Sequence, residues 1–219
     1  MAIKVITVKE DVFGANEEKA KQNQQRLDGS GVTAVNIMSS PGAGKTSLIL
    51  GTIKGLQGRA RISVVEGDVA SSVDAEKVNQ QGTPVVQINT DGGCHLDANM
   101  MASALDNLPL AETDLLFIEN VGNLICPAEF ALGEHKRVVI ASLPEGDDKP
   151  YKYPLMFTEA DVVLLNKADL LPYLDFNVEE FEKAVRGLNP GVSIMQVSCK
   201  TGEGMDAWLS WLLGQVKQK

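Results

Sequence analysis

Seven short runs of β-branched and other apolar residues alternate with segments of helical periodicity from residue 32 onward. The runs lie at 33–39, 61–67, 83–89, 114–120, 137–143, 161–167 and 192–198. They are almost continuously apolar, which is typical of parallel strands covered on both faces. The alternation predicts an α/β fold with a mostly parallel sheet of about seven strands and helices on both faces. Ligands of such a sheet bind beyond the carboxyl ends of its strands.

Length, charge and cysteine content narrow the class of protein. A chain of 219 residues can bury a core without disulfide bonds, and its three cysteines are an odd number that favours free thiols. The formal net charge of −9 argues against a nucleic-acid partner. No apolar run reaches the roughly 18–20 residues that span a bilayer, and the first residues lack a signal-peptide pattern. We therefore expect a cytoplasmic protein with neither a nucleic-acid nor a membrane partner.

The first 30 residues differ from the rest. The stretch IKVITV alternates apolar and polar residues and predicts a short strand, while ANEEKAKQNQQRL predicts a polar helix that ends at the DGSG turn. We interpret 1–30 as an N-terminal appendage, a loosely packed arm, and 31–219 as one nucleotide-binding domain that also carries a metal site.

The segment SSPGAGKTS, residues 39–47, joins the first strand run to a helical pattern. It matches the phosphate-binding pattern G-x-x-x-x-G-K-S/T except at its first position, which is Ser39. The glycines allow backbone N–H groups to face phosphate oxygens, Lys45 reaches the β- and γ-phosphates, and the Thr46 hydroxyl can bind Mg²⁺. The chain is therefore predicted to be a P-loop nucleoside triphosphatase. The candidate phosphate-binding residues are Ser40, Gly42, Ala43, Gly44, Lys45, Thr46 and Ser47.

Two later strand ends predict the base. In NKAD, residues 166–169, the Asp169 carboxylate can accept hydrogen bonds from N1–H and the exocyclic amine of guanine, a donor pair that adenine does not offer. The segment SCKTGEG, residues 198–204, resembles the last guanine-contacting loop of GTPases. We therefore predict a site for GTP and GDP. Its candidate base-binding residues are Asn166, Lys167, Asp169, Ser198, Cys199 and Lys200.

Hydrolysis of GTP to GDP and phosphate needs Mg²⁺ and a positioned water. At the corresponding strand end, ENVGN places Glu119 three residues before Gly122. Glu119 is the candidate that orients Mg²⁺, together with Thr46 and with Asp68 as a second carboxylate; Asp74 is the weaker candidate. No glutamine is obviously placed to orient the water, so we expect slow intrinsic turnover.

Cys94 and His95 are adjacent in GGCHLDANM, at the end of the third run. Thiolate and imidazole suit Ni²⁺ and Zn²⁺. The sequence leaves two interpretations open here, a half-buried loop and an incomplete metal site, because three donors per chain do not fill a tetrahedral site.

A family resemblance bears on this choice. SSPGAGKTSL, VVEGDVASSVDAEKV, QINTDGGCHLDA, ENVGNLICP, EGDDKPYKYP, LNKADL and SCKTGEGM together resemble the nickel-insertion GTPases of hydrogenase maturation, HypB. The resemblance covers residues 32–219 and implies an α/β G domain of the SIMIBI type that forms a GTP-dependent homodimer. It also implies that Cys94, His95 and Cys126 bind nickel or zinc at the dimer interface, where a second copy can complete the site.

The resemblance implies a GTP-hydrolysing metallochaperone that helps insert nickel into a hydrogenase large-subunit precursor, with a nickel-binding accessory protein as a further partner. The alternatives are a urease-type nickel accessory GTPase and a regulatory GTP-binding module with a structural zinc. Many relatives carry an N-terminal cysteine motif or a histidine-rich stretch. This chain has no Cys before 94 and no His before 95, so neither feature is present.

Three further residues have simpler interpretations. We expect Cys199 to be a small buried side chain within the guanine loop. We expect His135 to be a solvated surface histidine. Lys149, in EGDDKPYKYP, is expected either to be solvated, to pair with Asp147 or Asp148, or to reach phosphate across a dimer.

Overall fold

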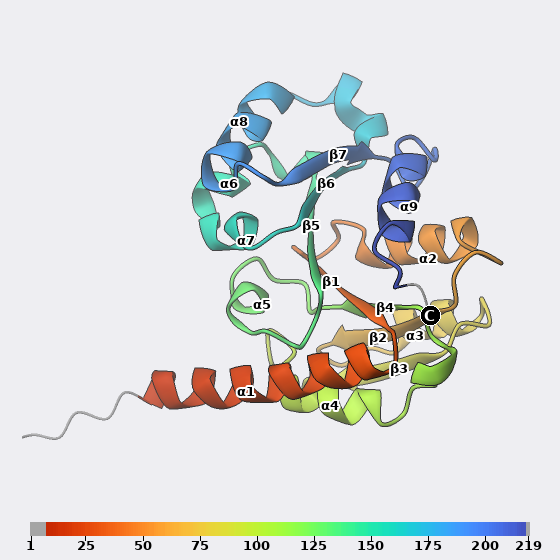
Figure 1. The fold of residues 1–219 in the computed structure, drawn as a ribbon. Helices are drawn as coiled ribbons and strands as arrows, with labels where there is room; N and C mark the ends of the chain where they lie inside the picture. Colours follow the sequence, from red (N-terminus) through yellow and green to blue (C-terminus); the bar gives the residue numbers. More distant parts are fainter. Residues whose placement is uncertain (1–7, 218–219) are drawn as a thin grey trace, which may run out of the picture.

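A computed structural model describes the backbone of residues 8–217 and the side chains of residues 13–217 (Figure 1). Its seven strands form one sheet in the order β3-β2-β4-β1-β5-β6-β7, and every neighbouring pair is parallel. The predicted α/β class and the seven-stranded parallel sheet are therefore confirmed. The strands are β1 (Thr33–Ser39), β2 (Ile62–Asp68), β3 (Val85–Asn89), β4 (Leu115–Glu119), β5 (Lys136–Ser142), β6 (Val162–Asn166) and β7 (Ser193–Val197).

Helices connect successive strands and cover both faces of the sheet (Figure 1). Within residues 8–217 no helix is both long and apolar enough to cross a bilayer. The helices are α1 (Val8–Gly29), α2 (Lys45–Gly55), α3 (Val73–Asn79), α4 (Ala98–Leu105), α5 (Cys126–Glu129), α6 (Lys149–Lys152), α7 (Pro154–Thr158), α8 (Val178–Leu188) and α9 (Met205–Leu213), with 3-10 turns η1 (Leu110–Glu112), η2 (Leu143–Glu145) and η3 (Ala168–Tyr173).

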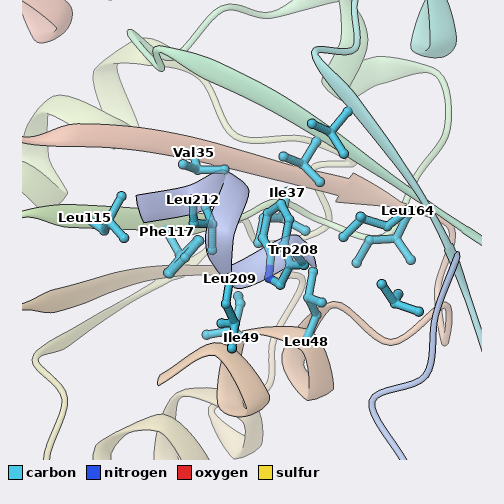
Figure 2. Close-up of a cluster of buried hydrophobic side chains, with 14 of the residues drawn as sticks. Val35, Ile37, Leu48, Ile49, Leu115, Phe117, Leu164, Trp208, Leu209 and Leu212 are labelled. Atoms are coloured by element: carbon cyan, nitrogen blue, oxygen red, sulfur yellow. The ribbon is translucent and has the colours of Figure 1, made fainter. Parts of the chain in front are cut away.

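One face of the sheet packs on α2, α3 and α9. Alternate residues of β1, Val35 and Ile37, point to this face together with Phe117 of β4 (Figure 2). The side chain of Trp208 in α9 is fully buried there, and its Nε1 donates a 2.8 Å hydrogen bond to Thr52 Oγ1 of α2. Because the indole N–H has a partner, the whole ring can be buried without an unsatisfied donor.

The opposite face packs on α1 and α4 at one end of the sheet and on α7 and α8 at the other. Helix α1 packs against α4, and its Leu27 is fully buried. Asn16 and Asn23 of α1 are also buried and bond to the chain around residues 98 and 131–132.

The predicted polar helix is therefore present, but residues 13–29 do not form a loosely packed arm. Polar anchors replace the apolar stripe that the sequence lacks. The strand expected in IKVITV lies outside the described residues except for Val8, where α1 begins. The boundary near residue 30 stays a prediction.

Candidate functional site

The phosphate loop lies where β1 ends and α2 begins. Gly42 and Gly44 adopt positive φ angles of 75° and 106°, which L-residues with side chains rarely adopt. Helix α2 starts at Lys45, so its unpaired N–H groups face the space above the loop. Lys45 is buried, and its Nζ donates a 3.3 Å hydrogen bond to Ser39 Oγ. The serine that departs from the general pattern thus contacts the lysine that the pattern requires.

The NKAD segment is attached directly to this loop. Asn166 Nδ2 donates a 2.8 Å hydrogen bond to Ala43 O, and Lys167 Nζ donates one of 2.8 Å to Gly42 O. A Cβ on Gly44 would lie 2.4 Å from Asn166 Nδ2, so glycine is needed at 44 for packing as well as for its φ angle. The predicted base-binding and phosphate-binding segments are therefore joined directly by two hydrogen bonds.

A cavity of about 320 Å³ lies between the NKAD and SCKTG segments. Ser198 Oγ donates a 2.6 Å hydrogen bond to Asp169 Oδ1 and so fixes the orientation of the carboxylate. Cys199 is half-buried and its Sγ donates to Asn166 Oδ1 at 3.6 Å; burial raises the pKa of this thiol. The walls are formed by Gly44, Ser47, Asn166, Lys167, Asp169, Leu170, Ser198, Cys199 and Lys200.

A second cavity, of about 450 Å³, continues from the phosphate loop toward β2 and β4. Lys45, Thr46, Asp68, Asp74 and Glu119 all line it, so the structure brings the predicted metal and phosphate residues together. Glu119, at the end of β4, accepts a 2.9 Å hydrogen bond from Thr46 Oγ1.

Glu66 is a residue of this cavity that the sequence analysis missed. It lies directly opposite Glu119 in the register of β2 and β4, and its side chain is buried. Burial and the neighbouring negative charge of Glu119 raise the pKa of Glu66, and burial raises that of Glu119, so the pair holds a proton near neutral pH. The available signal was a charged residue inside the apolar run RISVVEG.

The carboxylates of Glu66, Asp74 and Glu119 have oxygens within 4.8 Å of one another. Glu66 Oε2 and Glu119 Oε2 have no hydrogen-bond partner within residues 8–217. Buried carboxylate oxygens beside a threonine hydroxyl suit a hard divalent cation such as Mg²⁺, which takes oxygen ligands. The donor chemistry of this cavity therefore fits Mg²⁺.

Asp68 has a different environment from the one expected. Its Oδ1 accepts hydrogen bonds from the backbone N–H groups of Ala70 and Ser71, at 3.0 and 2.8 Å, which lowers its pKa. Asp68 lines the cavity but lies outside the three-carboxylate group, whereas the weaker candidate Asp74 belongs to it.

Cys94, His95 and Cys126 come together although 31 residues separate His95 from Cys126. The two sulfurs lie 2.8 Å apart, and Cys94 Sγ lies 3.6 Å from His95 Nδ1. All three donor atoms lie within 4.8 Å of one another, with Cys94 exposed and the other two partly buried. Burial lowers the pKa of His95, which favours the neutral imidazole that binds metals. The set fits a thiophilic divalent ion such as Ni²⁺ or Zn²⁺.

Neighbouring side chains hold these ligands in place. The His95 ring stacks on Phe130 with a centroid distance of 3.9 Å, and Phe130 contacts Phe13 of α1 at 5.0 Å. Asn123 Nδ2 donates to Cys126 Sγ at 3.7 Å. None of these supporting residues carries a sequence signal, because each acts through a contact distant along the chain or through loop geometry.

His135 and Lys149 both have partners within the protein. His135 is not a solvated histidine: its side chain is 15% exposed, Nδ1 accepts a 2.9 Å bond from Ala34 N, and Nε2 lies 3.1 Å from Asp28 Oδ1. Lys149 is partly buried and donates to Glu145 O at 2.5 Å and to Asp148 Oδ1 at 3.3 Å.

Comparison with known proteins places this geometry in a family. Residues 33–196 match the family model described as the CobW/HypB/UreG nucleotide-binding domain. The hydrogenase maturation factor HypB of Azotobacter vinelandii is 48% identical over 209 residues, which cover 95% of this chain and 69% of that protein.

Two solved structures have the same fold. HypB from Helicobacter pylori, in complex with nickel, superimposes with a TM-score of 0.88 at 36% identity, covering 94% of this chain and 98% of that one. HypB from Archaeoglobus fulgidus gives 0.86 at 41% identity, covering 92% and 98%. The chain therefore belongs to the CobW/HypB/UreG family of P-loop nucleotide-binding proteins and, within it, to the HypB hydrogenase maturation factors.

Proposed function

We propose that this HypB protein is a GTP-hydrolysing metallochaperone that helps insert nickel into the precursor of a nickel–iron hydrogenase. The observation that carries the proposal is one juxtaposition. A donor set of two thiols and an imidazole lies on loops that leave the same sheet edge as the phosphate loop and the Glu66–Glu119 pair.

The nucleotide chemistry follows from the residues that line the two cavities. Asp169, oriented by Ser198, selects guanine; Lys45 and the N-terminus of α2 offset the charge of the phosphates. Thr46 and Glu119, with Asp68 at the cavity edge and Glu66 and Asp74 beside them, would hold Mg²⁺, which neutralises charge that develops on the γ-phosphate. No glutamine lines this cavity within residues 8–217, so the expected intrinsic rate of hydrolysis is low.

The metal carried by the Cys94–His95–Cys126 set is treated as cargo. Three donors leave a tetrahedral or square-planar ion incomplete, and a second copy of the chain related by two-fold symmetry would supply the remainder. We propose that GTP favours this homodimer, and that dimerisation and hydrolysis change the affinity for nickel. A nickel-binding accessory protein would load the site or unload it toward the large-subunit precursor in the cytoplasm.

Deletion of the gene in its host tests the proposal. We expect loss of nickel-hydrogenase activity, restored by excess nickel, because the chaperone is needed only when nickel is scarce. Urease activity in the same strain, where the host has it, separates the hydrogenase role from the urease-accessory alternative. Unchanged hydrogenase activity would contradict the proposal.

A second measurement separates cargo from structural metal. Ni²⁺ and Zn²⁺ affinities are compared with GDP and with a non-hydrolysable GTP analogue, for the wild type and Cys94→Ala. The metallochaperone predicts affinities that depend on the nucleotide. A regulatory module with structural zinc predicts equal affinities in both states and a Cys126→Ala variant that still supports hydrogenase maturation.

A further inference from the structure

Asn120 lies between the nucleotide cavity and the loop of Cys94 and His95. It follows Glu119 directly at the end of β4 and is fully buried. Its Oδ1 accepts two backbone hydrogen bonds, from Leu96 N at 3.2 Å and from Val121 N at 3.0 Å. The side-chain amide of Asn120 therefore links Leu96, the residue after His95, to the segment that follows Glu119.

Leu96 is held from two directions by the strand ends that carry the buried carboxyls. Its side chain is fully buried against Gly67, the residue after Glu66, where an added Cβ would lie 2.8 Å from the Leu96 side chain. Its backbone N–H is held by Asn120, the residue after Glu119. Because packed interiors leave few voids, a shift of either strand end would push or pull Leu96 with it.

The network extends from Asn120 to the second metal-bearing segment. Asn120 Nδ2 donates to Asn36 Oδ1 at 3.3 Å, and Asn36 Nδ2 donates to Glu134 Oε1 at 3.3 Å. Glu134 Oε2 accepts a 2.7 Å bond from Leu132 N, six residues after Cys126. Asn36, Asn120 and Glu134 are all buried, so breaking one link leaves a polar group without water to replace its partner.

The nucleotide side of the network is equally close-packed. Glu119 accepts the hydrogen bond of Thr46 Oγ1, the hydroxyl that binds Mg²⁺ in phosphate loops of this type. A Cβ on Gly122 would lie 3.0 Å from the backbone of Pro41 in the phosphate loop. Residues 119–122 therefore contact the nucleotide cavity on one side while Asn120 holds the metal-ligand loop on the other.

We propose that Asn120 is the positioning residue through which the nucleotide state sets the geometry of the Cys94–His95 loop. The inference rests on the proposed function, since it concerns how GTP would alter metal affinity. Asn120 borders the nucleotide cavity, but both polar atoms of its side chain bond to Leu96, Val121 and Asn36, so it acts on the metal-ligand loop through Leu96. Asparagine meets the need because its oxygen accepts from two backbone N–H groups while its amide nitrogen donates to Asn36.

The test compares two variants that remove the same Asn120–Asn36 hydrogen bond. Asn120→Leu also frees Leu96 N–H, whereas Asn36→Leu leaves the bond from Leu96 to Asn120 in place. For each protein the dissociation constant of Ni²⁺, and separately of Zn²⁺, is measured with GDP and with a non-hydrolysable GTP analogue.

We expect the wild type to show a ratio of the two constants of about fivefold or more, the range of ordinary allosteric coupling. Asn120→Leu should reduce the ratio to within about twofold of unity, and Asn36→Leu should retain it. A merely structural role of Asn120 predicts that both variants lose stability and both keep the ratio, and that result would overturn the inference.

Hydrogen exchange in the wild-type protein gives a readout that does not depend on the folding of a variant. The exchange rate of the Leu96 amide should differ between the GDP and GTP-analogue states, because its acceptor moves with residues 119–122. Equal protection in both states would overturn the inference.

The metal affinities of the wild-type protein distinguish a failure of the proposed function from a failure of the role assigned to Asn120. If the wild type binds metal with no dependence on nucleotide, the proposed coupling function fails and this inference fails with it. If the wild type shows the dependence and Asn120→Leu keeps it, only the assignment of Asn120 fails.

Discussion

We expect the carboxylate of Asp169 to decide which base the nucleotide cavity accepts. Its orientation is set by one hydrogen bond from Ser198, which arrives from the loop after β7, 29 residues away along the chain. Sequence motifs name both residues, but only the fold shows that one orients the other. Replacing Asp169 and Ser198 one at a time therefore distinguishes the contact with the base from the hydrogen bond that orients the carboxylate.

Asp169→Ala would remove the proposed acceptor of two guanine donors. Hydrogen bonds to a charged group are worth about 1.5–3 kcal/mol each, so the affinity for GDP should fall roughly 100-fold or more. Ser198→Ala should cost about tenfold or less, since the carboxylate remains. Titration calorimetry measures both, with the exposed Asp175→Ala as control. Equal losses for the two site variants would contradict the assigned roles.

His135 gives the folded protein a pH dependence whose sign can be stated. Burial, followed by the nearby Lys217 charge, lowers the pKa of His135 below its ordinary value of 6.5, while Asp28 and Glu134 act in the opposite direction. Nδ1 accepts from Ala34 N and must be unprotonated to do so. The unfolded chain therefore binds a proton at a higher pH than the folded chain does.

By linkage, the contribution of His135 is fully present above pH 6.5 and is lost as the pH falls through its folded pKa. The urea midpoint of the wild type should decrease from neutral to mildly acidic pH. His135→Asn, whose Oδ1 can take the place of Nδ1 as the acceptor for Ala34 N, should show a smaller decrease. His95 titrates with the same sign, so the difference between the two proteins is the informative quantity.

Helix α1 shows how an element can be predicted while its role is not. Its residues favour a helix and are mostly polar, and the lack of an apolar stripe predicts a helix that faces solvent. Asn16 and Asn23 face inward nevertheless and bond to backbone groups at 98, 131 and 132, just after the candidate metal-ligand segments. Local periodicity carries no information about such distant backbone groups.

Asn23→Ala should destabilise the protein through α1. Asn23 Nδ2 donates to Ala98 O at 2.8 Å and to Leu132 O at 3.0 Å, and both carbonyls would lose this donor in a buried site. The expected loss in free energy of unfolding is about 1–3 kcal/mol. Gln25→Ala, on the exposed side of the same helix, should change it by less than about 0.5 kcal/mol. Urea unfolding of both variants decides whether α1 is integral to the domain.

On the scale of the whole molecule, large exposed apolar side chains lie beside both halves of the site. Val69 and Val73 follow β2 at the nucleotide cavity, and Ile125 precedes Cys126; they are 45%, 54% and 57% exposed. Apolar side chains gathered beside a functional site are typical of surfaces that associate. Their position suits a dimer that would be completed around the shared metal.

Ile125→Asp should prevent the proposed GTP-dependent dimer while leaving nucleotide binding intact, because a charge would be buried in the proposed interface and no nucleotide-cavity residue changes. Light scattering after size-exclusion chromatography, with a GTP analogue, measures the oligomer. Leu155→Asp, which places the same charge at another exposed apolar side chain, on α7, is the control. A dimer that persists in Ile125→Asp would place the interface elsewhere.

The strands, the phosphate loop and the predicted guanine segments could all be located from the sequence, since each follows from local periodicity and from residue types at fixed spacing. The sequence also identified Cys94, His95 and Cys126 as candidates through the family resemblance. It named Asp68, with Asp74 as the weaker candidate, and missed Glu66, because a carboxylate at the end of a strand is typical of a ligand and one inside an apolar run is not.

Which carboxyls face each other depends on the packing of the strands and could not be predicted from the sequence. The register of β2 on β4 sets Glu66 opposite Glu119 across 53 residues of chain, while Asp68 turns to its own loop. The same holds for the 2.8 Å approach of the Cys94 and Cys126 sulfurs and for the bond from Leu96 to Asn120. Local patterns fix backbone conformation, but the direction of a side chain at a strand end depends on neighbours that are distant in sequence.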